Sequence, residues 1–490
     1  MHPRQLKNLC FGRLIFFKIQ KSGEACFLYF FNKSSKVITK HTKTSSFTGN
    51  PYRRLLRQDY PEPLIALLAF ILGIWLWDHY FGKIQGYAPG TEEIALVKID
   101  RDLRLADAME EDPDWLRWLA GAEKPEKARA EALEVFQKLA KEKAISPQSL
   151  EAFAIVKSVH TGISMRELMG QFLQGSMISD FQEISDRLAR HEGTWWNARL
   201  IEVWEENAQP ATLWRQSHGE DALALETRAV VARSSVWLLA LVGLAFIPAS
   251  LRCLKSGLSA KRVGYGSAWP LSLGVMVFFV ATLAWIGFSS TLDLGLGLLP
   301  SLHPFFAILL DSIARVLPML IALSILFKRP SHAIRVLGMN QKFHPKLILG
   351  TFSLLLLLDQ VFRWAMASSV SSDPGGGLSM GDSGGWGLAF ALISACLLAP
   401  LAEEVLYRGV LFRSLWNRIG VIPGALISSA VFAILHFYDA YGLLSVGFFG
   451  FTCALLYAGS GSLATVVLLH VLYNSSIKIP EWIVYHAPFG

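Results

Sequence analysis

The sequence predicts an all-α protein, a polytopic bundle of about eight to nine membrane helices with an inserted soluble helical domain. Its content of 52% hydrophobic and only 17% charged residues is too apolar for an ordinary soluble protein. Residues 91–230 are the exception, because they carry 26 acidic and 17 basic side chains within a chain of net charge +7. One acidic, water-soluble block therefore interrupts a basic, membrane-embedded protein.

The N-terminal region is expected to comprise two parts. Residues 1–60 form a basic, poorly structured arm, and the sequence leaves open whether residues 1–50 belong to the natural protein. Residues 61–82 contain the first membrane helix, at 63–80, with aromatic side chains at its far end. Arg53, Arg54 and Arg57 precede this helix, so the N-terminus is expected in the cytoplasm.

Residues 83–228 are expected to form a soluble, mainly helical acidic domain. Apolar residues recur at helical spacing, and the length is typical of one domain. Trp195 and Trp196 are interpreted as core packing rather than as a binding groove, although a partner protein for this domain stays open. Counting spans places the domain on the extracytoplasmic side.

Eight further apolar segments divide the rest of the chain into helices 2 to 4 at 229–344 and a membrane core at 345–490. Basic loops follow every second segment, which predicts that these loops are cytoplasmic. The basic excess therefore reflects membrane topology rather than nucleic-acid binding, and the five scattered cysteines predict no disulfide framework. The segments are 234–251, 268–288, 304–327, 347–366, 386–412, 421–438, 443–458 and 462–479.

Charged side chains inside these segments need partners or a function, because an ionised group in hydrocarbon costs roughly 3 kcal/mol or more. Asp311 with Arg315, and Asp359 with Arg363, are spaced i, i+4 and are interpreted first as structural ion pairs. A role in lining a substrate path is the alternative.

Glu403, Glu404 and Arg408 set two carboxylates against one guanidinium. Glu404 and Arg408 share a helix face at i, i+4, whereas Glu403 lies ~100° around the helix and has no local partner. We therefore expect Glu403 to act as a general base and Glu404 to be anchored by Arg408.

Three more polar residues lie on the following apolar segments. Glu404 and His436 are each sixteen residues from the turn near Gly420, so antiparallel helices bring them to one depth. His470 and Asn474 share a face of the last segment at i, i+4. We expect these groups to meet in one buried layer.

The order of these motifs is similar to a known family. Glu-Glu-x-x-x-Arg at 403–408, Phe-x-x-x-His at 432–436 and His-x-x-x-Asn at 470–474 resemble the CPBP (Abi) intramembrane proteases, which include the type II CAAX prenyl endopeptidases. Gly447, Gly450 and the turn at 459–463 also fit, and the resemblance covers about residues 345–479.

The resemblance implies a mechanism. Glu403 and His436 would activate a water molecule for attack on a peptide carbonyl, and His470 and Asn474 would stabilise the oxyanion. The family is described as metal-dependent, and Glu403, His436 and His470 can ligate zinc, which would make the protein a metalloprotease. A metal-free Glu/His/Asn site also suffices for water activation, so no cofactor follows from the sequence.

The predicted function is that of a hydrolase: a CAAX-protease-like endopeptidase in a bacterial inner or plasma membrane that cleaves a protein or peptide at the bilayer. A non-proteolytic scaffold or peptide-immunity protein of the same fold is the alternative. A transporter with a proton relay would fit the polarity of the segments but not the order of the motifs. The sequence does not identify the substrate, a prenyl pocket or the oligomeric state.

Overall fold

The computed structural model describes residues 91–142, 146–165, 167–168, 183–186, 194–204, 219–260, 269–298, 304–366, 384–436 and 440–486. Regular structure in these ranges is helical throughout, in agreement with the predicted all-α class. The predicted arm at 1–60 and the first membrane helix at 61–82 lie outside the described residues.

Five helices form a small domain that precedes the membrane bundle. The helix α8 shows why the elements begin and end where they do: the Ser146 side chain accepts a hydrogen bond from the Ser149 amide, Pro147 opens the first turn, and Gly162 ends the helix at φ 74°. Trp195 and Trp196 are fully buried in the core of this domain. The helices are α5 (Thr91–Ala108), α6 (Asp114–Ala120), α7 (Pro125–Glu142), α8 (Pro147–Thr161) and α11 (Thr194–Trp204).

The helix α13 (Gly219–Leu244) belongs to two hydrophobic cores. Its first half places Ala222 and Ala229 in the core of the small domain, and its second half places Ala240 in the core of the bundle. The predicted domain boundary at residue 228 therefore falls inside one continuous helix. The predicted span at 234–251 is corrected, because the helix is interrupted at residues 245–246 and α14 (Ile247–Leu258) begins anew.

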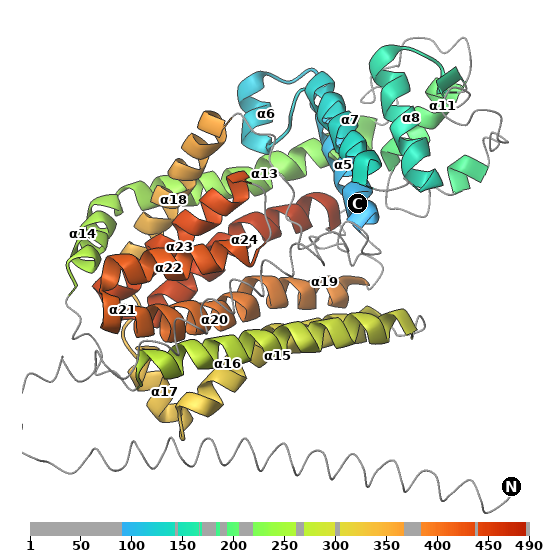
Figure 1. Cartoon of the computed structure of the whole chain (residues 1–490). Helices are drawn as coiled ribbons and strands as arrows, with labels where there is room; N and C mark the ends of the chain where they lie inside the picture. Colours follow the sequence, from blue (N-terminus) through green and yellow to red (C-terminus); the bar gives the residue numbers. More distant parts are fainter. Residues whose placement is uncertain are drawn as a thin grey trace, which may run out of the picture. The chain divides into compact units, whose positions relative to one another are not determined.

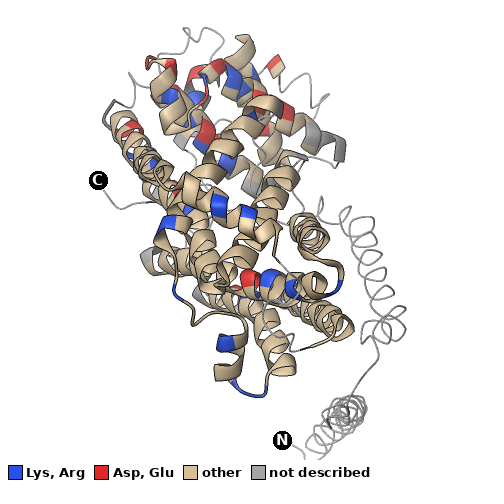
Figure 2. Cartoon of the chain, turned by 90° about the vertical axis from the view of Figure 1, so that its left-hand side faces the viewer, with Lys and Arg blue, Asp and Glu red and all other residues tan. Residues whose placement is uncertain are grey.

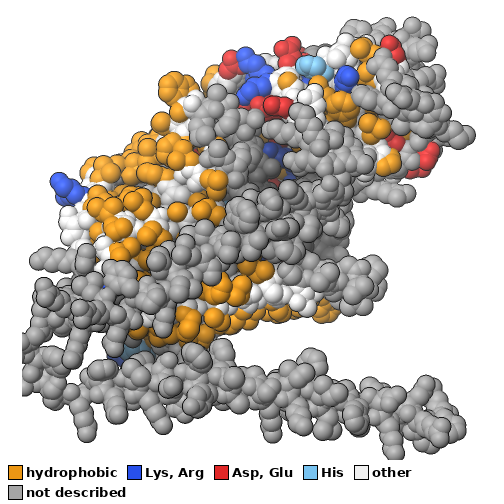
Figure 3. Space-filling model, in the orientation of Figure 1, with side chains coloured by type: hydrophobic (Ala, Val, Ile, Leu, Met, Phe, Trp, Pro, Cys, Tyr) orange, Lys and Arg blue, Asp and Glu red, His pale blue; other side chains and the backbone are white. Residues whose placement is uncertain are grey.

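Seven helices among the described residues are long and apolar enough to cross a membrane. Charged residues gather in the small domain, whereas the bundle carries few (Figure 2). Apolar side chains cover much of the surface that the described residues of the bundle show in Figure 3. The protein is an integral membrane protein. The bundle contains α13, α14, α15 (Leu271–Leu298), α16 (Pro304–Leu326), α17 (Pro330–Val336), α18 (Pro345–Met366), α19 (Gly384–Ile393), α20 (Ala399–Glu403), α21 (Arg413–Ile419), α22 (Val421–Ile434), α23 (Ala440–Ser460) and α24 (Leu463–His486).

The helix α22 is shorter than the predicted segment at 421–438. It has fourteen residues, about 21 Å of helix, which is less than the hydrocarbon thickness of a bilayer. The turn that follows it carries His436. This short helix therefore ends next to a half-buried polar side chain.

The contact between α14 and α23 depends on two glycines. A Cβ added to Gly257 would lie 2.2 Å from the Leu455 carbonyl oxygen, and one added to Gly459 would lie 2.3 Å from the Cys253 carbonyl oxygen. Each helix thus provides a glycine where the backbone of the other passes, as is common between membrane helices. This close contact fixes α23 beside the site described next.

Candidate active site

The apolar segment from α19 to α21 is not a regular α-helix. It contains two π-helical stretches, η3 (Ser394–Leu398) and η4 (Glu404–Phe412), separated by α20. π-Helical turns are rare in proteins, and those that do occur are often found at functional sites. All nine residues of η4 are buried, and Glu404 is its first residue. The irregular backbone therefore coincides with the predicted carboxylate pair.

Glu404 is completely buried and has two charged or polar partners. Its Oε1 lies 3.0 Å from Nη1 of Arg408 and 2.8 Å from Nδ1 of His470. Its Oε2 is also buried and has no hydrogen-bond partner among the described residues. The second oxygen thus keeps its capacity to accept a hydrogen bond inside the site.

His470 lies between the two neighbouring carboxylates. Its Nδ1 is 2.8 Å from Oε1 of Glu404, and its Nε2 is 3.7 Å from Oε2 of Glu403. The imidazole is buried, whereas the Glu403 side chain is 29% exposed. The spacing of residues in the sequence grouped His470 with Asn474 and did not predict that it would bridge both glutamates.

Aromatic rings complete the walls of this cluster. The guanidinium of Arg408 lies 4.3 Å above the ring of Phe432, within the range of a cation–π interaction. The same ring is 4.5 Å from the His436 ring and 6.1 Å from the His470 ring, measured between centroids. Phe449 also contacts His470, at 4.8 Å between ring centroids. The two histidines are therefore brought together around Phe432.

A glycine on α23 makes room for Arg408. A Cβ added to Gly450 would lie 3.0 Å from Nη2 of Arg408 and 3.2 Å from the Phe432 ring. Gly450 is part of the motif pattern in the sequence, but its role becomes visible only when α23 and η4 are seen side by side.

The remaining two predicted residues, His436 and Asn474, each contact a backbone carbonyl oxygen. His436 is half-buried, and its Nδ1 lies 2.6 Å from the carbonyl oxygen of Phe432 in α22, the helix that precedes it. Asn474 donates a hydrogen bond from Nδ2 to the carbonyl oxygen of Ala395 in η3, at 3.0 Å. Asn474 thus ties α24 to the irregular backbone beside the two glutamates.

The predicted zinc ligands do not converge into a metal site. Within the described ranges, no three His, Cys, Asp or Glu side chains are arranged to hold a metal ion. The set of Glu403, His436 and His470 therefore does not fit a tetrahedral zinc centre in this arrangement.

Residues 385–476 match the family model described as "Type II CAAX prenyl endopeptidase Rce1-like". The resemblance to the type II CAAX prenyl endopeptidases that the motifs predicted is confirmed for this segment. All six predicted site residues lie within this segment. They are carried by α20, by η4, by the turn after α22 and by α24.

One relative supports the same family. The Bacillus subtilis protein named "Putative membrane peptidase YdiL" is 31% identical over 90 residues. The alignment covers 18% of this chain and 36% of that protein, so the chain matches about a third of its relative's length. No solved structure matches the chain. The small domain and the helices α13 to α18 lie outside the matched segment.

Proposed function

We propose that this protein is an intramembrane endopeptidase of the CAAX-protease type, which hydrolyses a peptide bond of a protein or peptide substrate at the membrane. The observation that carries the proposal is the position of His470, held between Glu404 at 2.8 Å and Glu403 at 3.7 Å. A buried histidine fixed by one carboxylate and facing a second, partly exposed carboxylate has the parts needed for acid–base catalysis.

Glu403 acts as the general base. Its side chain is 29% exposed, so a water molecule can approach the carboxylate, whereas Glu404 is completely enclosed. Glu403 removes a proton from this water with the help of His436, and the resulting hydroxide attacks the carbonyl carbon of the scissile bond. The carbonyl oxygen becomes the oxyanion of a tetrahedral intermediate, and the proton is then delivered to the leaving amine.

His470 stabilises the oxyanion. In the imidazolium form its Nδ1 donates to Glu404, and its Nε2 presents a second N–H on the side of Glu403. Two carboxylates, one guanidinium and one imidazolium then have no net charge, so the cluster can be buried without an uncompensated ion. Asn474 supports this arrangement from α24, through its hydrogen bond to Ala395.

The orientation in the membrane is part of the proposal. Lys255 on α14, Arg335 on α17 and Arg418 on α21 lie in the last turns of their helices, and Arg252 lies three residues before Lys255 on α14. We place this basic end in the cytoplasm of a bacterial cell and the small domain on the opposite side of the inner membrane. Reporter fusions after residues 260 and 204 test the assignment, since the proposal requires opposite compartments for them.

The experiment that tests the activity compares Glu403→Gln with the unchanged protein in a deletion strain. Newly formed protein N-termini in isolated membranes are identified by mass spectrometry. The proposal expects a set of termini that is present with the unchanged protein and lost with Glu403→Gln. Asp311→Asn, which changes a half-exposed ion-paired carboxylate on α16, is the matched control and should keep them. Identical termini in all three strains would favour the non-proteolytic scaffold.

A further inference from the structure

A short helix of the small domain exposes two tryptophans on one face. Trp115 is 66% exposed and Trp118 is 55% exposed, although both belong to the seven-residue helix α6. Their i, i+3 spacing puts them side by side. Tryptophans that are more than half exposed are unusual in water, and an apolar ring with a polar N–H suits a boundary between an apolar and a wet phase.

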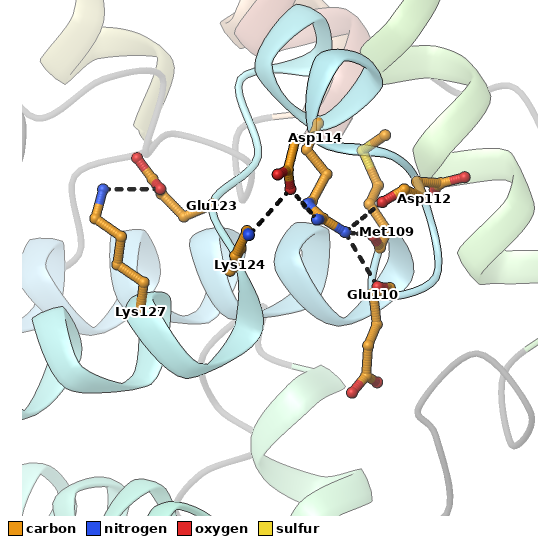
Figure 4. Close-up of polar contacts among 8 residues, drawn as sticks. Met109, Glu110, Asp112, Asp114, Glu123, Lys124 and Lys127 are labelled. Atoms are coloured by element: carbon orange, nitrogen blue, oxygen red, sulfur yellow. Dashed lines mark hydrogen bonds and ion pairs between the residues drawn. The ribbon is translucent and has the colours of Figure 1, made fainter. Parts of the chain in front are cut away.

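The face is held rigidly by an arginine on the opposite side of α6. Arg117 donates from Nη1 to the carbonyl oxygens of Met109 at 3.2 Å and Glu110 at 3.1 Å. It also bonds the Asp112 carbonyl oxygen and the Asp114 carboxylate, as Figure 4 shows. The turn before α6 is thereby fastened to the helix, so the tryptophans have a fixed orientation.

The helix α6 packs against α13 at a defined position. The rings of Trp118 and Trp237 are 4.9 Å apart. Gly121, which ends α6 at φ 72°, lies so close to Arg233 that an added Cβ would be 3.3 Å from the guanidinium carbon. The contact therefore covers the single turn of α13 between Arg233 and Trp237.

This turn of α13 can be assigned a depth in the bilayer. Ser353 Oγ donates to the Ala240 carbonyl oxygen at 2.7 Å, and Gly243 lies against Leu349, so α13 and α18 are antiparallel with these residues level. Seven residues further along each helix, about 10 Å, Arg233 on α13 is level with Gln360 on α18, next to Asp359 of the ion pair that Asp359 forms with Arg363.

Three features mark that level as the membrane surface. The charged side chains of Arg233 and of the Asp359–Arg363 pair occur together there. Trp364, one residue beyond Arg363, is 83% exposed, as expected for the aromatic belt of a membrane protein. Below the same level on α13, exposed apolar side chains are closely spaced, at Leu238 with 63% exposure and then at Leu241, Val242 and Leu244, whereas above it they occur singly, at Leu223 and Val231.

We propose that α6 is an interfacial anchor whose Trp115 and Trp118 insert into the boundary between the lipid headgroups and the acyl chains. The occupant is phospholipid, because the exposed tryptophan face is continuous with the lipid-facing side chains of α13. Trp118, Trp237 and Trp364 then belong to one aromatic belt. The anchor seats the small domain on the bilayer beside the helix that enters it.

The test measures quenching of tryptophan emission by brominated phosphatidylcholine in nanodiscs that contain the full chain. The double variant Trp115→Phe, Trp118→Phe keeps an aromatic side chain at both positions, and its emission is subtracted from that of the unchanged protein. We expect this difference emission to be quenched at least twofold by lipid brominated near the headgroup, and less by lipid brominated near the end of the acyl chain.

Trp196→Phe is the matched control, since Trp196 is 1% exposed in the core of the same domain. Its difference emission should be insensitive to both brominated lipids. The proposal is overturned if the difference emission of the double variant is equally insensitive. In that case, quenching by acrylamide identifies a water-exposed face, and resistance to acrylamide identifies a face covered by protein.

Discussion

The small domain and the membrane bundle each bury a carboxylate beside an arginine, but they do so with different consequences. In the domain, Asp107 is 0% exposed and is held by Arg199 at 2.8 Å and by the Trp195 indole N–H at 2.6 Å. In the bundle, Glu404 is equally buried and is held by Arg408 and His470.

The difference lies in what surrounds each pair. Asp107 is contacted by permanent cations and an indole, none of which transfers protons at neutral pH. Glu404 holds a histidine whose other nitrogen faces the partly exposed Glu403. A buried ion pair is therefore a structural feature by default, and it becomes a candidate active site when a proton-transfer group connects it to a position that water can reach.

The largest effect that would separate the two clusters is a loss of activity at His470. His470→Asn removes the N–H proposed to stabilise the oxyanion, so we expect turnover to fall roughly 10²- to 10³-fold. His332→Asn, at a histidine of α17 that packs on Phe327 and is not among the predicted site residues, should leave turnover unchanged. The measurement is the rate of formation of the substrate termini identified with the unchanged protein. Equal rates in both variants would remove His470 from the mechanism.

The corresponding change in the domain should act on stability. Asp107→Ala removes the carboxylate with which Arg199 and Arg129 both pair, while the two arginines stay buried. We expect this to lower the free energy of unfolding by about 3–5 kcal/mol. Thermal unfolding of the domain, followed by limited proteolysis between residues 91 and 204, measures this loss. Unchanged proteolysis would show that Asp107 contributes little to the fold.

A smaller effect is expected at the glycine beside Arg408. Gly450→Ala adds a methyl group 3.0 Å from Arg408 and 3.2 Å from Phe432, so the guanidinium must shift. We expect a cost of about 1–3 kcal/mol, seen as lower turnover or a lower melting temperature. Gly447→Ala is the control on the same helix, because its added carbon would meet only Ala433 at 3.6 Å, an ordinary contact. Equal effects at both sites would contradict the packing argument.

The last effect concerns pH. Burial raises the pKa of Asp100 in the domain from 3.8 to about 6, although Arg104 opposes the shift. The folded state therefore binds a proton that the unfolded state lacks, and this contribution to stability is complete below pH 4 and is lost as the pH rises through about 6. Asp100→Asn should flatten the dependence of domain stability on pH over this interval. An unchanged slope would assign the pH dependence to another group.

The sequence by itself determined the kind of fold and the set of candidate residues. Apolar segments of membrane length predict helices because backbone polar groups in lipid must bond within their own segment. The cost of burying charge singles out Glu403, Glu404 and Arg408, and the spacing of motifs adds His436, His470 and Asn474. These inferences need only local geometry and solvation, which residue types and spacing contain.

Only the tertiary structure decided which of these residues touch. The sequence predicts one buried layer for the site residues but does not say which of them touch, because Glu404 and His470 lie at unequal distances from their nearest turns, ~24 Å and ~14 Å along the helices. In the structure these two are hydrogen-bonded. The two turns are at different levels, because Gly409 lies beside Leu463 and α21 continues beyond the start of α24. The π-helical turns and the relative sliding of packed helices depend on contacts between segments far apart in the chain. The spacing of residues within one segment does not contain that information.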